Sequence, residues 1–118
     1  MTKEQKLSLL AKNPMEVFVV TNRKDDMRYY LLCTPRKDGD GRKLASELRG
    51  RLKETIESFA VDRNADHSAI KLKSCRYLSD GEIRATFTMP DTMEFGFTEF
   101  LYDRADILDI DILEAGED

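Results

Sequence analysis

Hydrophobic and polar positions follow two different periods along the chain, and the longest regular stretch has the helical one. Apolar residues recur every three or four positions over 42–60, which puts them on one face of a helix. They are Leu44, Leu48, Leu52, Ile56 and Phe59. Asp40 stands before the stretch as a capping residue, and the turn-like segment 62–68 follows it. We therefore expect an amphipathic helix over 42–60.

A second, shorter helix is expected over 3–12. Thr2 and Gln5 have the spacing of a capping box at its start. Asn13 precedes Pro14, and a residue before proline avoids the α region, so the helix ends there. A helix of this length persists only when it docks on other structure.

Two segments with strand-like composition follow, at 15–22 and 27–34. Both are β-branched or apolar on both faces, and a polar loop of hairpin length separates them. Strands with two apolar faces are typical of the centre of a covered sheet. We expect a helix to cover one face and a partner subunit to cover the other.

A second hairpin is predicted from 69–78 and 82–89, because Asp80-Gly81 lies between two apolar-patterned runs. A two-residue turn at this point places Leu78 opposite Ile83. The same register puts Arg76 on the core face, which is unfavourable for a charge. A bulge near Cys75, or a buried partner for Arg76, would remove the conflict.

The remaining apolar stretches are 92–103 and 107–113. The first fits strand alternation and helical spacing almost equally, the latter through Met93, Phe97, Phe100 and Leu101. We favour a strand over 93–101, because Phe, Thr and Tyr are strand formers and Gly96 weakens a helix. Residues 107–113 alternate as a half-buried strand with an acidic outer face, and 114–118 read as a frayed acidic tail.

The predicted order of elements is therefore α-β-β-α-β-β-β-β. This order indicates an α+β fold with two helices packed on a mostly antiparallel, hairpin-built sheet. The chain of 118 residues has the size of one domain, so we expect a single domain over 1–118.

Charge is distributed unevenly along this chain. The formal net charge is −4, yet residues 103–118 hold seven acidic side chains and a single basic one, Arg104. The rest of the chain is therefore slightly basic. An acidic balance disfavours a general phosphate binder, but a locally basic surface remains compatible with it.

Four carboxylates form the densest part of the acidic run: Asp103, Asp106, Asp109 and Asp111. Asp109 and Asp111 are expected on one strand face, ~7 Å apart. Such a run has three interpretations: a weak hard-cation site, a surface that docks a basic partner, or a solvated edge that prevents sheet-to-sheet pairing. The spacing of an EF-hand is absent, and we predict no metal ligands here.

These features make a small protein-binding module our first hypothesis, of the inhibitor, immunity-protein or chaperone-adaptor kind. It would use the acidic C-terminal strand edge, towards a basic partner protein, or a homodimer interface. The alternative is nucleic-acid binding by a basic face, with phosphates on cations and a base stacked on tyrosine. The residues assigned to that face are Arg42, Arg49, Lys53, Lys71, Lys73, Tyr77 and Arg84.

The chemistry of a catalytic or cofactor site is not evident. His67 is the single histidine, and we expect a solvated loop residue. Cys33 and Cys75 are expected as buried free thiols of a reducing compartment. No catalytic residues, cofactor or metal are predicted, so an enzyme ranks behind both binding hypotheses. A signal peptide and a membrane span are also not evident, which favours a cytoplasmic protein without a membrane partner.

Overall fold

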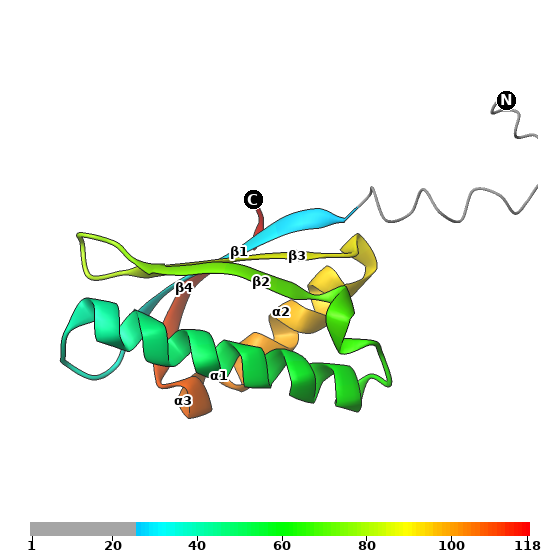
Figure 1. Ribbon diagram of the computed structural model, residues 1–118, viewed down its shortest axis with the longest axis horizontal. Coiled ribbons are helices and arrows are strands. Elements are labelled where there is room, and N and C mark those ends of the chain that lie inside the picture. The colour runs from blue at the N-terminus through cyan, green and yellow to red at the C-terminus, as the bar shows by residue number, and fades with distance from the viewer. Residues whose placement is uncertain (1–25) are drawn as a thin grey trace, which may run out of the picture.

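The computed structural model describes residues 26–118, which form four strands and three α-helices (Figure 1). In chain order these are β1 (Met27–Pro35), α1 (Gly41–Asp62), β2 (Lys71–Tyr77), β3 (Ile83–Met89), α2 (Glu94–Asp103), α3 (Ala105–Leu108) and β4 (Ile110–Glu117). Single-turn 3-10 helices precede β2 and α2. The predicted helix 3–12 and strand 15–22 lie outside the described residues.

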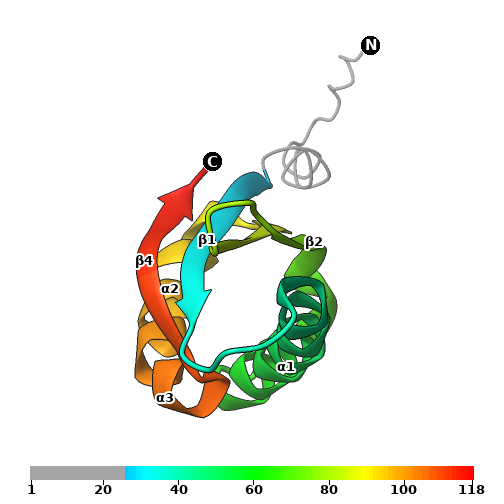
Figure 2. The ribbon, with the colours of Figure 1, turned by 90° about the vertical axis from the view of Figure 1, so that its left-hand side faces the viewer.

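The four strands form one sheet in the order β2-β3-β1-β4, and every neighbouring pair is antiparallel. The helix α1 connects β1 to β2, and α2 and α3 connect β3 to β4. All three helices lie on the same face, with α1 beneath β2 and α2 beneath β4 (Figure 2). This is the connectivity of the split βαβ, ferredoxin-like motif. The predicted class, an α+β fold with helices on an antiparallel sheet, is confirmed.

The predicted helix 42–60 is confirmed as α1. The Asp40 carboxylate caps it by accepting a hydrogen bond from the Arg42 backbone N–H at 3.2 Å. Four of the five residues in the predicted stripe are buried, and Leu44 is half-buried at the end of the stripe. Burial of this face against the sheet, rather than helix propensity, keeps a helix of this length formed.

The strand predicted at 27–34 is confirmed as β1, a central strand. Its edges are occupied by β3 on one side and β4 on the other. The other strand of the predicted hairpin, residues 15–22, lies outside the described residues. Tyr29, Leu31 and Cys33 are buried under the helices, while Tyr30 and Leu32 are half-buried on the opposite face. We call that opposite face the open face.

The β2–β3 hairpin is confirmed, but its predicted register is wrong by one residue. The Leu78 N–H donates to the Glu82 carbonyl at 2.7 Å, which leaves a three-residue loop. Gly81 in that loop has φ +88°, a conformation that glycine adopts readily. Tyr77 therefore lies opposite Ile83. A three-residue loop with a glycine at its end is a common hairpin connection.

The three-residue loop and a bulge in β2 resolve the predicted conflict at Arg76. The register shifts between Leu72 and Ser74, so Lys73 has no partner on β3. The three-residue loop pairs Arg76 with Arg84 on the open face, and the extra residue at Lys73 lets Leu72 remain on the core face, opposite Phe87. The bulge expected near Cys75 is thus present, two residues earlier in the chain.

The strand predicted at 93–101 is wrong, because these residues lie in the helix α2. Helical spacing buries Phe97, Phe100 and Leu101, whereas Phe95 is 72% exposed. A strand would have put Phe95 and Phe97 on the same face. The intrinsic strand preference of aromatic residues is overridden by the packing of these rings into the core.

The C-terminal strand begins and ends later than predicted. Residues 105–108 form the short helix α3, and Asp109 follows with φ 61°, so the strand β4 covers 110–117. The segment 114–118 is not frayed. Glu117 pairs with Tyr29, and the Asp118 N–H donates to the Arg28 carbonyl at 2.8 Å.

An aromatic cluster fills the space between helices and sheet. Phe97 of α2 makes edge-to-face contacts with Tyr29, Phe59 and Phe87, at centroid distances of 5.9, 5.3 and 5.4 Å. Tyr29 is fully buried, and its hydroxyl is hydrogen-bonded to Thr98 at 2.6 Å. Burial raises the pKa of Tyr29 to about 12.

Within residues 26–118, no helix has the length and apolar character needed to cross a bilayer.

Candidate functional site

The fold gathers six cations along one edge of the sheet, and we call them the basic strip. They are Arg42, Arg49 and Lys53 of α1 together with Lys71, Lys73 and Arg76 of β2. The three helix residues recur at intervals of seven and four, so they share one flank of α1 over ~16 Å. That flank faces β2, because α1 lies beneath this edge strand (Figure 2). Of the seven residues predicted to bind nucleic acid, six lie on or beside this edge. They are Arg42, Arg49, Lys53, Lys71, Lys73 and Tyr77.

An open groove of about 360 Å³ runs between α1 and β2. Its lining contains three arginines, two hydroxyl side chains and no carboxylate: Arg42, Ala45, Ser46, Arg49, Cys75, Arg76 and Tyr77. Burial raises the pKa of Cys75 to about 11, and the nearby charge of Arg49 acts in the opposite direction. The Arg49 guanidinium is therefore close enough to the groove to influence a thiol inside it.

Tyr77 is not on the open face, where the predicted register had placed it. It lies opposite the buried Ile83, and its ring rests against the backbone of Gly41 at the start of α1. A Cβ atom at position 41 would overlap the ring, so glycine permits this close approach. The side chain is still 41% exposed and forms one end of the groove.

The cations of the basic strip have no acidic partner among residues 26–118, where every ion pair involves other cations. The glutamates of α1 lie mainly elsewhere. Glu47 contacts Lys37 at 3.6 Å, and Glu54 lines a groove shared with Arg104. Only Glu57 follows the strip, one turn after Lys53. Within the described residues, the strip is therefore a local surface of positive charge without ion-pair partners.

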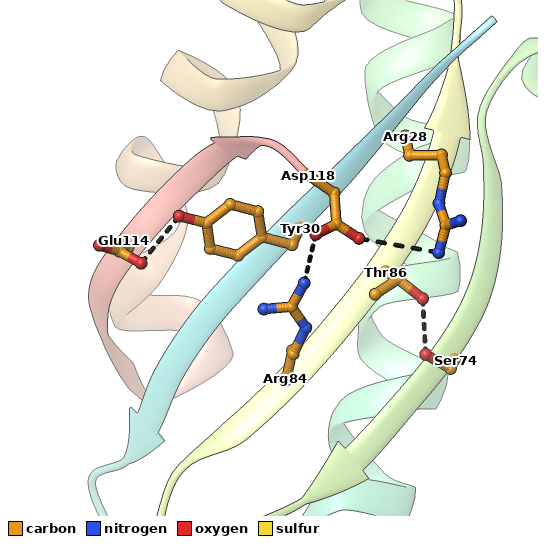
Figure 3. Close-up of polar contacts among 7 residues, drawn as sticks. All are labelled: Arg28, Tyr30, Ser74, Arg84, Thr86, Glu114 and Asp118. Carbon is orange, nitrogen blue, oxygen red and sulfur yellow. Dashed lines mark hydrogen bonds and ion pairs between the residues drawn. The ribbon is translucent and has the colours of Figure 1, made fainter.

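Arg84 is the one predicted nucleic-acid residue that lies away from the strip. It projects from the open face, where its guanidinium donates to Asp118 Oδ1 at 2.6 Å (Figure 3). The same guanidinium stacks on the Tyr30 ring, 4.6 Å from its centroid. Tyr30 in turn donates its hydroxyl to Glu114 at 2.7 Å, and this hydrogen bond raises the pKa of Tyr30.

Three of the four predicted acidic residues contact Arg36, whose backbone N–H also donates to the Asp109 carbonyl at 2.9 Å. Arg36 binds both Asp106, at 2.6 Å, and Asp111, at 2.9 Å, and these two bonds raise the pKa of Arg36. Asp109 lies in the left-handed turn before β4, so the predicted strand face shared by Asp109 and Asp111 is wrong. Asp103 ends α2. Within the described part of the chain, no three His, Cys, Asp or Glu side chains are arranged to hold a metal ion.

The remaining candidates are isolated side chains. His67 is exposed in a loop, as predicted. Cys33 is a buried free thiol and Cys75 a half-buried one, and the strand β3 separates them. Burial raises the pKa of Cys33 to about 12, so both thiols are protonated near neutral pH and are poor nucleophiles.

Sequence reasoning missed two residues of these surfaces. Arg76 was assigned to the core face, because nothing in the sequence distinguished a three-residue hairpin loop from a two-residue turn. Tyr30 was assigned to a covered strand face, and its contact with Arg84 depends on a strand pairing between β1 and β3 that local pattern does not specify.

Comparison of the chain with protein-family models, curated proteins and solved structures finds no match. The case for a function therefore rests on the arrangement of these side chains.

Proposed function

We propose that this protein binds single-stranded nucleic acid along the basic strip. One observation carries the proposal: six cations line the α1–β2 edge, and none has an acidic partner within residues 26–118. Free lysine and arginine side chains attract the phosphate backbone and release its bound counterions, which is the main source of non-specific affinity.

The preference for a single strand is supported by Tyr77. An aromatic ring binds a base by stacking only when that base is unpaired, and each stacked base contributes about 1–3 kcal/mol. Tyr77 is partly exposed at the end of the groove, close to Arg42 and Arg76. This pairing of a ring with flanking cations suits an extended strand whose phosphates follow the cations.

The proposal is tested with fluorescently labelled oligothymidylate and a duplex of the same length, by anisotropy at low salt. We expect the wild type to bind the single strand more tightly than the duplex. Arg49→Glu should weaken binding on the order of tenfold, because it replaces a phosphate contact by a repulsive charge. Lys43→Glu is the matched control, since it makes the same charge change on the exposed face of α1, away from β2.

Two results would contradict the proposal. One is an absence of binding to either oligonucleotide at low salt. The other is an equal loss of affinity in Arg49→Glu and Lys43→Glu, which would indicate attraction to net charge rather than to the strip.

Protein binding at the edge strand β4 is a second candidate. It is supported by the unpaired outer edge of β4 within the described residues and by exposed apolar side chains on β4 and on the helix α2 beneath it. Leu113 on β4 is 49% exposed, and Phe95 on α2 is 72% exposed. A basic partner in extended conformation would add a strand here. Hydrogen exchange of the β4 amides, with and without a lysine-rich strand-forming peptide, tests it, and unchanged exchange would oppose it.

We further infer a cytoplasmic location. Two free thiols, Cys33 and Cys75, support a reducing compartment.

A further inference from the structure

The open face holds a second group of cations, and a carboxylate lies between them. Asp118 Oδ1 accepts from Arg84 at 2.6 Å, and Asp118 Oδ2 is 3.8 Å from Arg28 (Figure 3). The two guanidinium groups come from neighbouring strands, β3 and β1. One carboxylate thus occupies the point at which two arginines converge.

The open face connects this point to the basic strip. Across the sheet, Arg76 of β2 lies opposite Arg84 of β3. In the next row Ser74 shares a hydrogen bond with Thr86 at 2.6 Å, and Thr86 lies opposite Tyr30. Cations and hydroxyls therefore extend from the edge to the centre of the sheet without an intervening carboxylate in these two rows.

The centre of the face also offers a flat surface for a base. The Arg84 guanidinium lies over the Tyr30 ring, and both aromatic rings and guanidinium planes stack on unpaired bases. Among residues 26–118, the helices cover only the opposite face of the sheet (Figure 2). Arg28 is 74% exposed, so a ligand that approached the open face would meet this group directly.

We propose that Arg28 and Arg84 form a phosphate subsite on the open face, and that the Asp118 carboxylate occupies it in the absence of nucleic acid. The proposal rests on the proposed function and extends it, because a strand held at the basic strip would continue across β3 onto this subsite. A carboxylate and a phosphate offer arginine the same charge-assisted hydrogen bonds. Phosphate carries more acceptor oxygens and can replace the carboxylate at both guanidinium groups.

An exchange of this kind requires that the present ion pair be weak. The Asp118 side chain is 25% exposed and Arg84 33%, and pairs in contact with solvent contribute little free energy. Asp118 is therefore a competitor that lowers the affinity for nucleic acid slightly, rather than a fixed structural bond.

The test measures oligothymidylate affinity in Asp118→Asn. Removal of the competing charge should tighten binding about two- to fivefold, the factor that corresponds to a surface ion pair. Asp111→Asn is the matched control. It also removes one negative charge that pairs with arginine, but its partner is Arg36, outside the subsite. Binding by Asp111→Asn should change less than binding by Asp118→Asn.

The same titration is followed by NMR signals of the Tyr30 and Tyr77 rings. The subsite is supported if the signals of both rings shift on binding and only Asp118→Asn gains affinity for oligothymidylate. Shifts of Tyr77 alone, with equal affinities in the two variants, overturn the subsite and leave the proposed function standing. Shifts of neither ring overturn both. Weaker binding by Asp118→Asn overturns the subsite as well, because the carboxylate would then be part of the binding surface.

Discussion

The strands β2 and β4 form the two edges of one sheet, and their charges differ in sign and in partners. β2 and the adjacent flank of α1 carry six cations without an acidic partner among residues 26–118. On the β4 side, Arg36 binds two aspartates, and Tyr30 and Arg84 bind Glu114 and Asp118. Within residues 26–118, arginines thus compensate part of the acidic edge, at Asp106, Asp111 and Asp118, while the basic edge has no acidic partner.

This difference reverses the order that the charge count suggested. By count, the acidic run between residues 103 and 118 is the strongest charge feature of the chain. A charge that is already paired, however, gains little from a further partner, whereas an unpaired one attracts counterions or a ligand. We therefore place the proposed binding surface at the edge whose charges lack partners within residues 26–118, and not at the edge that has more charges.

The largest expected effect tests the packing that supports both edges. Phe97→Ala should lower the free energy of unfolding by ~3–5 kcal/mol, because its ring is fully buried against three other aromatic rings. Phe95→Ala, on the same helix but exposed, should change it by less than ~0.5 kcal/mol. Urea unfolding measures both. Similar losses would contradict the helix α2 and favour the strand, in which both rings share a face.

The next largest effect is the pH dependence of the free energy of unfolding. It compares Cys33, at the centre of the sheet, with Cys75 on the edge strand β2. The pKa of Cys33 is raised from 9.0 to about 12 and that of Cys75 to about 11. A raised pKa means that the unfolded state loses protons first. The contribution of each thiol to stability is therefore constant below about pH 9 and falls above it, by up to about 1.4 kcal/mol per pH unit.

Urea unfolding between pH 8 and 11, within the window set by these pKa values, tests the assignment. Cys33→Ala and Cys75→Ala should each reduce the decrease of the free energy of unfolding with pH. The effect of Cys33→Ala should extend to a higher pH than that of Cys75→Ala, because the pKa of Cys33 is higher. A slope unchanged by either substitution would mean that the thiols are more exposed than the fold implies.

Alanine substitutions at two glycines of α1 distinguish an effect on the position of Tyr77 from an effect on the stability of the helix. Gly41→Ala pushes the Tyr77 ring out of place and should weaken oligothymidylate binding about fivefold, the loss of ~1 kcal/mol of stacking. Gly50→Ala meets no neighbouring atom and should stabilise the protein by ~0.5–1 kcal/mol without a change in affinity. Equal affinities in both variants would remove Tyr77 from the site.

The smallest effect concerns the acidic edge. Arg36→Met removes the cation shared by Asp106 and Asp111. We expect a slightly lower thermal midpoint at low salt and no difference from wild type at about 1 M salt, where exposed charges are screened. A large loss that salt does not change would show that Arg36 acts through packing instead.

Much of the fold could be predicted from local pattern. The helix α1 has a regular apolar stripe, and the alternation of Ile83, Ala85, Phe87 and Met89 specifies β3. The segment 93–101 could not be decided, because its aromatic residues satisfy both periods and only the packing of Phe97 selects one. The order of the strands also depends on long-range pairing, which leaves no local signal.

The site was predictable in composition more than in geometry. The residues Arg42, Arg49, Lys53, Lys71 and Lys73 were expected to lie together and do lie along one edge of the sheet, because helical period and strand position place them; their role in binding stays a prediction. Arg76 and Tyr77 exchanged faces, since a hairpin loop one residue longer than predicted reverses the alternation. The hydrogen-bond partners of Asp106, Asp111, Glu114 and Asp118 lie 34 to 84 positions away in sequence, so charge pattern alone could not reveal these contacts.

The salt dependence of oligothymidylate affinity tests the contrast between the two edges most directly. Six phosphate contacts would give a slope of log K against log salt of about −4 for a single strand. Lys71→Ala combined with Lys73→Ala should make that slope shallower by about 1.4, because two fewer counterions are released. Asp106→Asn combined with Asp111→Asn should leave it unchanged. A slope that is insensitive to the β2 lysines, or that shifts equally with the β4 side aspartates, would contradict the account.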